Sequence, residues 1–227
     1  MTRWLKLDLA APMLAFGGVA IDHVGPTRDF PAASMLTGLF GNALGWHWRD
    51  RTAHQQLQDR LIFAAALVIE GRVVTDTQNA KLEKTDRGWT TWGEPEGRDG
   101  ASYDAPHRRR RDYLCDAEAL VVCRLAPGQG PDLATLAAAL KHPARPLFLG
   151  RKPCLPARPI YGGWVEAETA HAALAAALPF AARAQWPEGE GPDGARRIEI
   201  PDLRNWRSGL HGGTRPVIEG HVAPAAP

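Results

Sequence analysis

The N-terminal residues alternate between apolar and polar side chains. Leu5, Leu7 and Leu9 fall on one side of an extended chain, and Lys6 and Asp8 fall on the other. Successive side chains of a β-strand point to opposite faces of a sheet, so this period of two is typical of a strand with one buried face. Residues 3–9 are therefore predicted to form the first strand.

A long loop and a helix follow. Proline and glycine recur across residues 12–26, which predicts irregular structure, and Pro31 is well placed to begin a helix. Residues 32–46 carry apolar side chains on one helical face and glycine at positions 38, 41 and 45. Because each glycine costs a helix about 1 kcal/mol relative to alanine, we expect another backbone to approach this helix closely.

The next part of the chain contains its longest apolar run. A short polar helix is predicted near residues 53–60, and the apolar run covers residues 61–69 and ends before Gly71. With residues 72–74 behind that glycine, the pattern predicts a strand, a turn and a second short strand. The three alanines at 64–66 would also suit a helix.

Residues 76–111 contain many charges and glycines but almost no aliphatic side chains. Such a segment cannot bury itself, so we expect it to project from the body as a thumb, an extended hairpin. Trp89 and Trp92 are interleaved there with basic residues, a composition typical of proteins that stack the bases of single-stranded nucleic acids. The alternative is that these tryptophans pack back onto the domain.

Four consecutive arginines, Arg108, Arg109, Arg110 and Arg111, close the thumb and lead into a strand predicted for residues 112–125. Guanidinium groups keep their charge and present a fixed fork of donors to phosphate oxygens. The arginines therefore predict a phosphate contact. A solvated basic loop without a partner is the competing interpretation.

Two other loops carry candidate phosphate contacts. Thr27 and Arg28 precede the first predicted helix, whose free N–H groups favour an anion, although a simple turn fits these residues equally well. In a later proline-rich loop, Gly150 permits close approach of a ligand backbone, and Arg151 and Lys152 supply charge. An RNA backbone could lie there, and a rigid surface loop is the alternative.

An amphipathic helix is predicted after Pro131 and Asp132, where apolar side chains recur at i, i+3, i+4 and i+7 until Pro143. A further strand near residues 160–165 completes the order strand, helix, strand, strand, helix, strand. This order predicts the α+β fold class, with a ferredoxin-like βαββαβ domain of the kind that RNA-binding RRM domains also adopt.

The domain organisation follows from these elements. We expect a ferredoxin-like domain at residues 1–165, with the thumb inserted at about 76–111. Residues 166–227 are expected to form a C-terminal region, with a helix near 167–178 and arginine-rich strands that reach about residue 222.

Composition limits the classes of function. The chain has 227 residues and a formal net charge of +2, so a polyanion site must come from clustered charge. Cys115, Cys123 and Cys154 show no CxxC spacing, which predicts core cysteines in a reducing cytoplasm. We expect a soluble, cytoplasmic protein, because neither a signal peptide nor a run long enough to cross a bilayer is recognisable.

Several stretches together resemble one family. Residues 9–13, 25–31, 34–41, 111–117 and 148–154 are similar to signatures of the CasD family, the subunit that caps the 5′ handle in the type I-E CRISPR complex Cascade. The resemblance covers most of residues 1–165.

The resemblance implies a RAMP-type, non-catalytic organiser of an antiviral ribonucleoprotein complex. It implies that the ferredoxin-like domain caps the 5′ handle of the CRISPR RNA and that the thumb reaches towards the neighbouring backbone subunit. The large PAM-reading subunit is expected close by, and target DNA is expected to be met only through the complex. No cofactor, metal or membrane is expected. The predicted RNA-binding residues are Thr27, Arg28, Trp89, Trp92, Arg108, Arg109, Arg110, Arg111, Arg151 and Lys152.

Two enzymatic alternatives remain. In type I-C relatives the equivalent subunit is a metal-independent endoribonuclease that uses Tyr, Lys and His side chains, and His47 and His107 could form a general acid–base pair here. No matching tyrosine follows the first helix, where the chain reads Trp46-His47-Trp48. A metal-dependent nuclease is disfavoured, because the eight histidines form no HxxxH or HxxE pair.

Overall fold

The structure is a computed structural model, which describes residues 1–227 except 82–87, 90–94, 97–106, 194–195 and 226–227. Its centre is a seven-stranded antiparallel sheet in the order β10-β1-β9-β4-β11-β13-β12. In that order the strands are Tyr161–Ala167, Thr2–Ala10, Glu118–Leu125, Leu61–Ile69, Ala182–Pro187, His211–Val222 and Arg196–Arg204.

The predicted ferredoxin-like plan is confirmed. Along the chain, β1 is followed by α1 (Ala33–Ala43) and α2 (Arg51–Arg60), then β4, β9, α3 (Leu133–Lys141) and β10. The sheet order β10-β1-β9-β4 puts the first and third strands of this unit between the other two. The Asp132 carboxylate accepts a hydrogen bond from Thr135 N at 2.7 Å, so the predicted cap of α3 is present.

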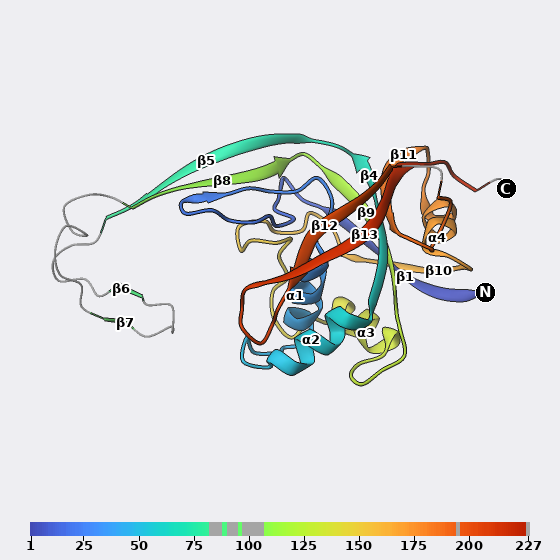
Figure 1. Cartoon of the computed structure of the whole chain (residues 1–227), viewed down its shortest axis with the longest axis horizontal. Helices are drawn as coiled ribbons and strands as arrows, with labels where there is room; N and C mark the ends of the chain where they lie inside the picture. The colour runs from blue at the N-terminus through green and yellow to red at the C-terminus, as the bar shows by residue number, and fades with distance from the viewer. Residues whose placement is uncertain (82–87, 90–94, 97–106, 194–195, 226–227) are drawn as a thin grey trace.

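Two hydrophobic clusters lie on opposite faces of the sheet. Leu5, Leu7 and Leu9 of β1 pack in the first cluster with α1 and α3. Trp4 packs in the second cluster with the Ala- and Leu-rich face of α4 (Ala170–Ala177). Figure 1 shows α4 on the other side of the sheet from α1, α2 and α3.

Burial on both faces explains the long apolar run at 61–69. Phe63, Ala65 and Leu67 belong to the first cluster, whereas Ala64 and Ala66 belong to the second. A strand that is covered on both faces needs no polar alternation, so its sequence becomes a continuous apolar run. The prediction of a strand here is confirmed, and the helical alternative is wrong.

The strand predicted at 112–125 is two strands. β8 (His107–Cys115) and β9 are separated at Asp116, which has a φ of 57°. On the opposite strand of this hairpin, Gly71 has a φ of 69° and lies against Ala117. The two strands of the hairpin therefore bend at the same level, and the chain leaves the main sheet there.

Beyond the bend, β8 belongs to a second sheet. It pairs with β5 (Arg72–Ala80) along one edge, and with β2 (Met13–Leu14) and β3 (Val24–Gly25) along the other. Figure 1 shows β5 and β8 as a long curved ribbon that leaves the body, with the β2 and β3 segments beside it. At the far end, β6 (Gly88–Trp89) pairs with β7 (Pro95–Glu96). The short strand predicted at 72–74 is thus a long one.

The sequence had predicted that another backbone approaches the glycines of α1, and this prediction is wrong. A Cβ atom at Gly38 would meet the Trp206 ring at 3.7 Å, and one at Gly41 would meet the His54 ring at 2.5 Å. Aromatic side chains from α2 and from the C-terminal hairpin, formed by β12 and β13, therefore occupy the space that the missing Cβ atoms leave.

The C-terminal strands extend the main sheet. β11, which the sequence pattern did not reveal, pairs with β4 and with β13 and so connects the C-terminal hairpin to the ferredoxin-like unit. Cys123 and Cys154 are buried as predicted, and burial raises the pKa of the Cys123 thiol. No helix in the described ranges has the length and apolar character that a bilayer span requires.

Candidate nucleic-acid interface

The four consecutive arginines lie within β8 and not in a loop. Arg108, Arg109 and Arg110 are exposed, and Arg111 is half-buried. Since side chains alternate along a strand, Arg108 and Arg110 point to one face of the ribbon and Arg109 and Arg111 to the other. Their cross-strand neighbours are mostly neutral: Asn79, Gln78, Thr77 and Asp76 of β5.

The strand that carries the arginines is held on both edges. β5 pairs along its whole length, and on the other edge the Arg110 N–H donates to the His23 carbonyl at 2.8 Å. None of the ion pairs between described residues involves Arg108 to Arg111. The result is a dense row of positive charge on a fixed backbone.

Arg111 reaches a hollow of about 430 Å³ between three loops. Glycine lines much of it, and a Cβ atom at Gly25 would lie 2.6 Å from Arg111 Nη1. Arg151 lies at the same place, with Nη2 at 3.1 Å from that hypothetical Cβ. The structure therefore brings together two of the predicted phosphate ligands. The hollow is lined by Ala15, Gly17, Gly18, Ala20, Gly25, Pro26, Arg111, Gly150 and Arg151.

The Arg151 guanidinium is engaged inside the protein. Its Nη1 donates to the Asp112 carbonyl at 2.9 Å and its Nη2 to the Gly25 carbonyl at 2.8 Å, while its carbon Cζ lies 4.9 Å from the Tyr113 ring. Arg151 thus ties its loop to β8 and β3. The neighbouring Lys152 is exposed.

Gly150 fixes the position of this loop. The Leu149 carbonyl accepts a hydrogen bond from Ala15 N at 3.1 Å, so the loop lies directly against the chain at Ala15. Gly150 has a φ of 95°, and a Cβ there would overlap the Ala15 carbonyl oxygen. The sequence had assigned close approach of a ligand backbone to Gly150, whereas the backbone that approaches is the protein's own.

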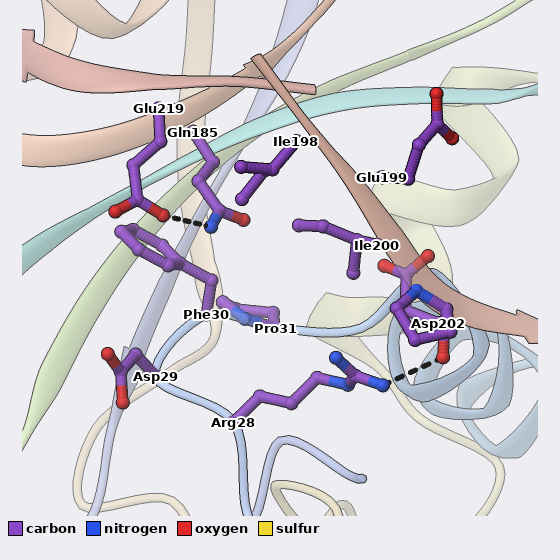
Figure 2. Close-up of a pocket in the computed structure, with 11 residues that line it drawn as sticks. Arg28, Asp29, Phe30, Pro31, Gln185, Ile198, Glu199, Ile200, Asp202 and Glu219 are labelled. Atoms are coloured by element: carbon purple, nitrogen blue, oxygen red, sulfur yellow. Dashed lines mark hydrogen bonds between the residues drawn. The ribbon is translucent and has the colours of Figure 1, made fainter. Parts of the chain in front are cut away.

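Thr27 and Arg28 support the loop before α1. Thr27 Oγ1 accepts from Phe16 N at 3.1 Å and donates to the Arg28 carbonyl at 3.2 Å. Arg28 donates a hydrogen bond to the Pro201 carbonyl at 2.7 Å, and it lines a second hollow, of about 330 Å³. Figure 2 shows that Asp29, Glu199, Asp202 and Glu219 also line this hollow.

The N-terminus of α1 already holds an anion. Ala33 N donates to Asp202 Oδ2 at 3.0 Å, and Asp202 is paired with Arg215 at 2.9 Å. The protein's own carboxylate therefore occupies the position that the sequence had offered to phosphate. Asp202 lies far from α1 in the sequence, so no local motif could have shown this contact.

The remaining predicted site residues are two tryptophans of the thumb and two histidines. Trp89 is in the two-residue strand β6, and Trp92 lies outside the described residues.

His47 lies in the connection between α1 and α2, where its backbone N–H donates a hydrogen bond to Asp50 Oδ2 at 2.7 Å, and His107 begins β8. Figure 1 shows that connection well away from the outer end of β8, so the suggested acid–base pair is not assembled. No cluster of three or more potential metal ligands occurs within the described ranges.

Comparisons with known proteins agree on one family. The sequence model of the family CRISPR-associated protein (Cas_Cas5) matches residues 4–218. The chain is similar to the CRISPR system Cascade subunit CasD of Escherichia coli (strain K12), with 29% identity over 174 residues, or 77% of this chain and 76% of that protein. Its fold is similar to a chain of a CRISPR RNA-guided surveillance complex, with a TM-score of 0.72, 22% identity and coverage of 98% of this chain and 91% of that one. A solved Cas protein gives a TM-score of 0.64 at 23% identity, with 99% of both chains covered.

Proposed function

The chain belongs to the CRISPR-associated Cas5 family, and on this premise we propose that it is an RNA-binding subunit of a Cascade surveillance complex. It binds the 5′ handle of the CRISPR RNA without cutting it. Its body and thumb join the backbone subunit of the complex to the large PAM-reading subunit. The similarity to the Cascade subunit CasD supports this role.

The row of arginines on β8 is the observation that carries the proposal. Four guanidinium groups stand on one strand that is paired on both edges, and Arg111 opens into a glycine-lined hollow. Each guanidinium is a rigid fork of donors that suits phosphate oxygens, and the paired backbone of β8 holds the four arginines at fixed positions along the strand. Phosphate contacts of this kind position an RNA without reading its sequence.

The other predicted residues have different roles in this proposal. Lys152 adds an exposed cation beside the hollow, and Arg151 holds the loop in place through its carbonyl contacts. Thr27 and Arg28 are assigned a structural role, because their side chains bind the protein's own groups. Trp89 and Trp92 of the thumb are assigned to base stacking.

Co-purification tests the proposal. Wild-type protein expressed with the other Cascade subunits and a CRISPR array is expected to retain CRISPR RNA. Simultaneous Ala replacement of Arg108, Arg109, Arg110 and Arg111 is expected to abolish that retention and to lower the salt dependence of RNA binding, since each lost phosphate contact removes about 0.7 from the slope for a single strand. A control that removes equal charge elsewhere, R49A/R196A/R197A/R207A, is expected to retain the RNA.

The rival endoribonuclease is tested with the same protein. Incubation with repeat RNA in EDTA is expected to give a complex and no cleavage product. A specific cut that depends on His47 or His107 would show that the protein is a processing enzyme and not an organiser.

A further inference from the structure

A third hollow, of about 340 Å³, lies between α1 and the end of β12. One wall is the half-buried face of α1, with Met35, Gly38 and Asn42, and another is formed by Phe148. Arg204 and Trp206, from the end of β12 and the turn after it, complete the rim. Apolar walls with a few polar groups and one cation are the usual composition of a small-molecule site.

Arg204 and Trp206 are fixed by one buried side chain. Gln58 of α2 donates from Nε2 to the Arg204 carbonyl at 2.8 Å, and its Oε1 accepts from Arg204 N at 3.1 Å and from Trp206 Nε1 at 3.0 Å. The Trp206 ring is also stacked on His54, with centroids 4.6 Å apart. The rim of the hollow is therefore built in advance of any ligand.

The Arg204 side chain carries a charge at the rim of this hollow and, like Arg196 and Arg207, forms no ion pair within the described ranges. Its Cζ lies 5.0 Å from the centroid of the Trp206 ring, and the residue is exposed. Over the described part of the chain no carboxylate pairs with it, whereas Arg183, Arg197 and Arg215 of the same C-terminal region are all paired. A guanidinium that rests on an indole and lacks a carboxylate partner is available to an anion.

This hollow adjoins the one that contains Arg111. The two share Ala15, Gly17 and Gly150. A fourth hollow, of about 400 Å³, shares Arg204 with the first of them and Gly18 with the other. A polyanion that starts at Arg111 can therefore pass over two glycines and reach Arg204.

We propose that the hollow between α1 and Trp206 binds one nucleotide of the same RNA, with Arg204 on its phosphate. Met35, Leu39 and Phe148 pack against the base. Ser34 Oγ and Asn42 Oδ1 offer polar groups to its edge, since Asn42 Nδ2 already donates to the Pro146 carbonyl at 2.8 Å. The inference rests on the proposed function, because it takes the ligand to be the RNA that the arginines of β8 bind. It extends the interface from the thumb to the C-terminal hairpin.

The test uses the full chain and a short fluorescein-labelled single-stranded RNA with the 5′ sequence of the host's CRISPR RNA. Arg204→Ala is expected to weaken binding roughly tenfold, as the loss of a charge-assisted phosphate contact does, and to reduce the salt slope by about 0.7. Arg204→Lys should restore the salt slope, because it keeps the charge. Arg207→Ala is the matched control, since Arg207 is exposed on the same turn and lines none of the three hollows.

Photo-crosslinking locates the nucleotide. RNA with 4-thiouridine at successive positions is expected to crosslink at one position to the peptide that contains Met35 or Phe148, and Arg204→Ala should remove that crosslink. If wild-type protein binds the RNA but Arg204→Ala matches Arg207→Ala in affinity and salt slope, the second site does not exist and the β8 interface stands. If wild-type protein does not bind the RNA, the proposed function fails together with this inference.

Discussion

At the scale of single residues, Asp202 joins three distant parts of the chain through one carboxylate. It is 4% exposed, it caps α1 through Ala33 N, and it receives hydrogen bonds from Nε and Nη2 of Arg215. The Arg215 guanidinium in turn lies 4.2 Å from the centroid of the Phe63 ring in β4. The first helix, the C-terminal hairpin and the central sheet are thus connected at one point.

Asp202→Ala is expected to destabilise the protein by about 3 kcal/mol in urea denaturation. The substitution leaves the largely buried Arg215 side chain, 18% exposed, without its partner, and it also removes the cap of α1. Losing one member of a buried pair has costs of this order. Glu199→Ala is the matched control on the same strand. Glu199 pairs with Arg197 in an exposed position, so its loss should change stability far less. Equal losses of stability in the two variants would mean that the Asp202–Arg215 pair contributes no more than an exposed ion pair.

Arginine contacts also show what single residues do not reveal in a sequence. Arg28, Arg60, Arg145 and Arg151 all donate to carbonyl oxygens of the protein, over sequence separations of 39 to 173 residues. Nothing near these arginines in the sequence distinguishes them from the exposed row on β8. The prediction of a basic patch could therefore name the residues, but only the fold separates the structural arginines from those that face solvent.

At the scale of elements, sequence patterns correctly predicted the strands and helices that a short segment specifies by itself. The strand at 61–69 and the helix after Asp132 were placed correctly, because apolar periodicity and a cap are properties of short segments. The break at Asp116 was missed, since it depends on the paired bend at Gly71 on the other strand of the hairpin. β11 was missed because its strand character comes from its neighbours, β4 and β13.

The position of the whole loop around Gly150 depends on the absence of a side chain at this residue. Gly150→Ala is expected to destabilise the protein and weaken RNA binding, because a Cβ at this position collides with the Ala15 carbonyl and moves the loop that Arg151 ties to β8. Thermal denaturation and fluorescence anisotropy with the labelled RNA measure the two effects.

Gly163→Ala is the control for this experiment. Gly163 also has a positive φ, of 104°, but no atom lies within 4 Å of a Cβ there, so only the backbone strain of about 1 kcal/mol remains. RNA affinity should be unchanged in the control. If Gly150→Ala binds RNA as Gly163→Ala does, the position of this loop does not matter for the interface.

At the scale of the whole molecule, charge divides the surface around the loop before α1. Arg111 and Arg204 line hollows that share residues with one another. The hollow of about 330 Å³, which adjoins them through Arg28, Pro201 and Asp202, is rimmed by Asp29, Glu199 and Glu219. A net charge of +2 hides this division, because the opposite charges cancel in the sum. The fold thus creates a surface for an anion from a composition that is nearly neutral.

The main sheet also predicts how the molecule unfolds. β11 pairs with β4, and Trp186 of β11 is 2% exposed in the same cluster as Trp4 and Ala64. The C-terminal strands therefore share a core with the ferredoxin-like unit, and the two parts should unfold in one cooperative transition.

Trp186→Ala tests this cooperativity by native-state hydrogen exchange. The cavity is expected to cost about 3 kcal/mol, and because the core is shared, the slowest amides of β1 should lose as much protection as those of β11. Phe180→Ala is the control, since Phe180 is 49% exposed just before the same strand and its removal should leave both sets of amides unchanged. If only the amides of β11, β12 and β13 lose protection in Trp186→Ala, the C-terminal strands open independently. The surface that contains Arg204 could then form and dissolve while the β8 interface stays folded.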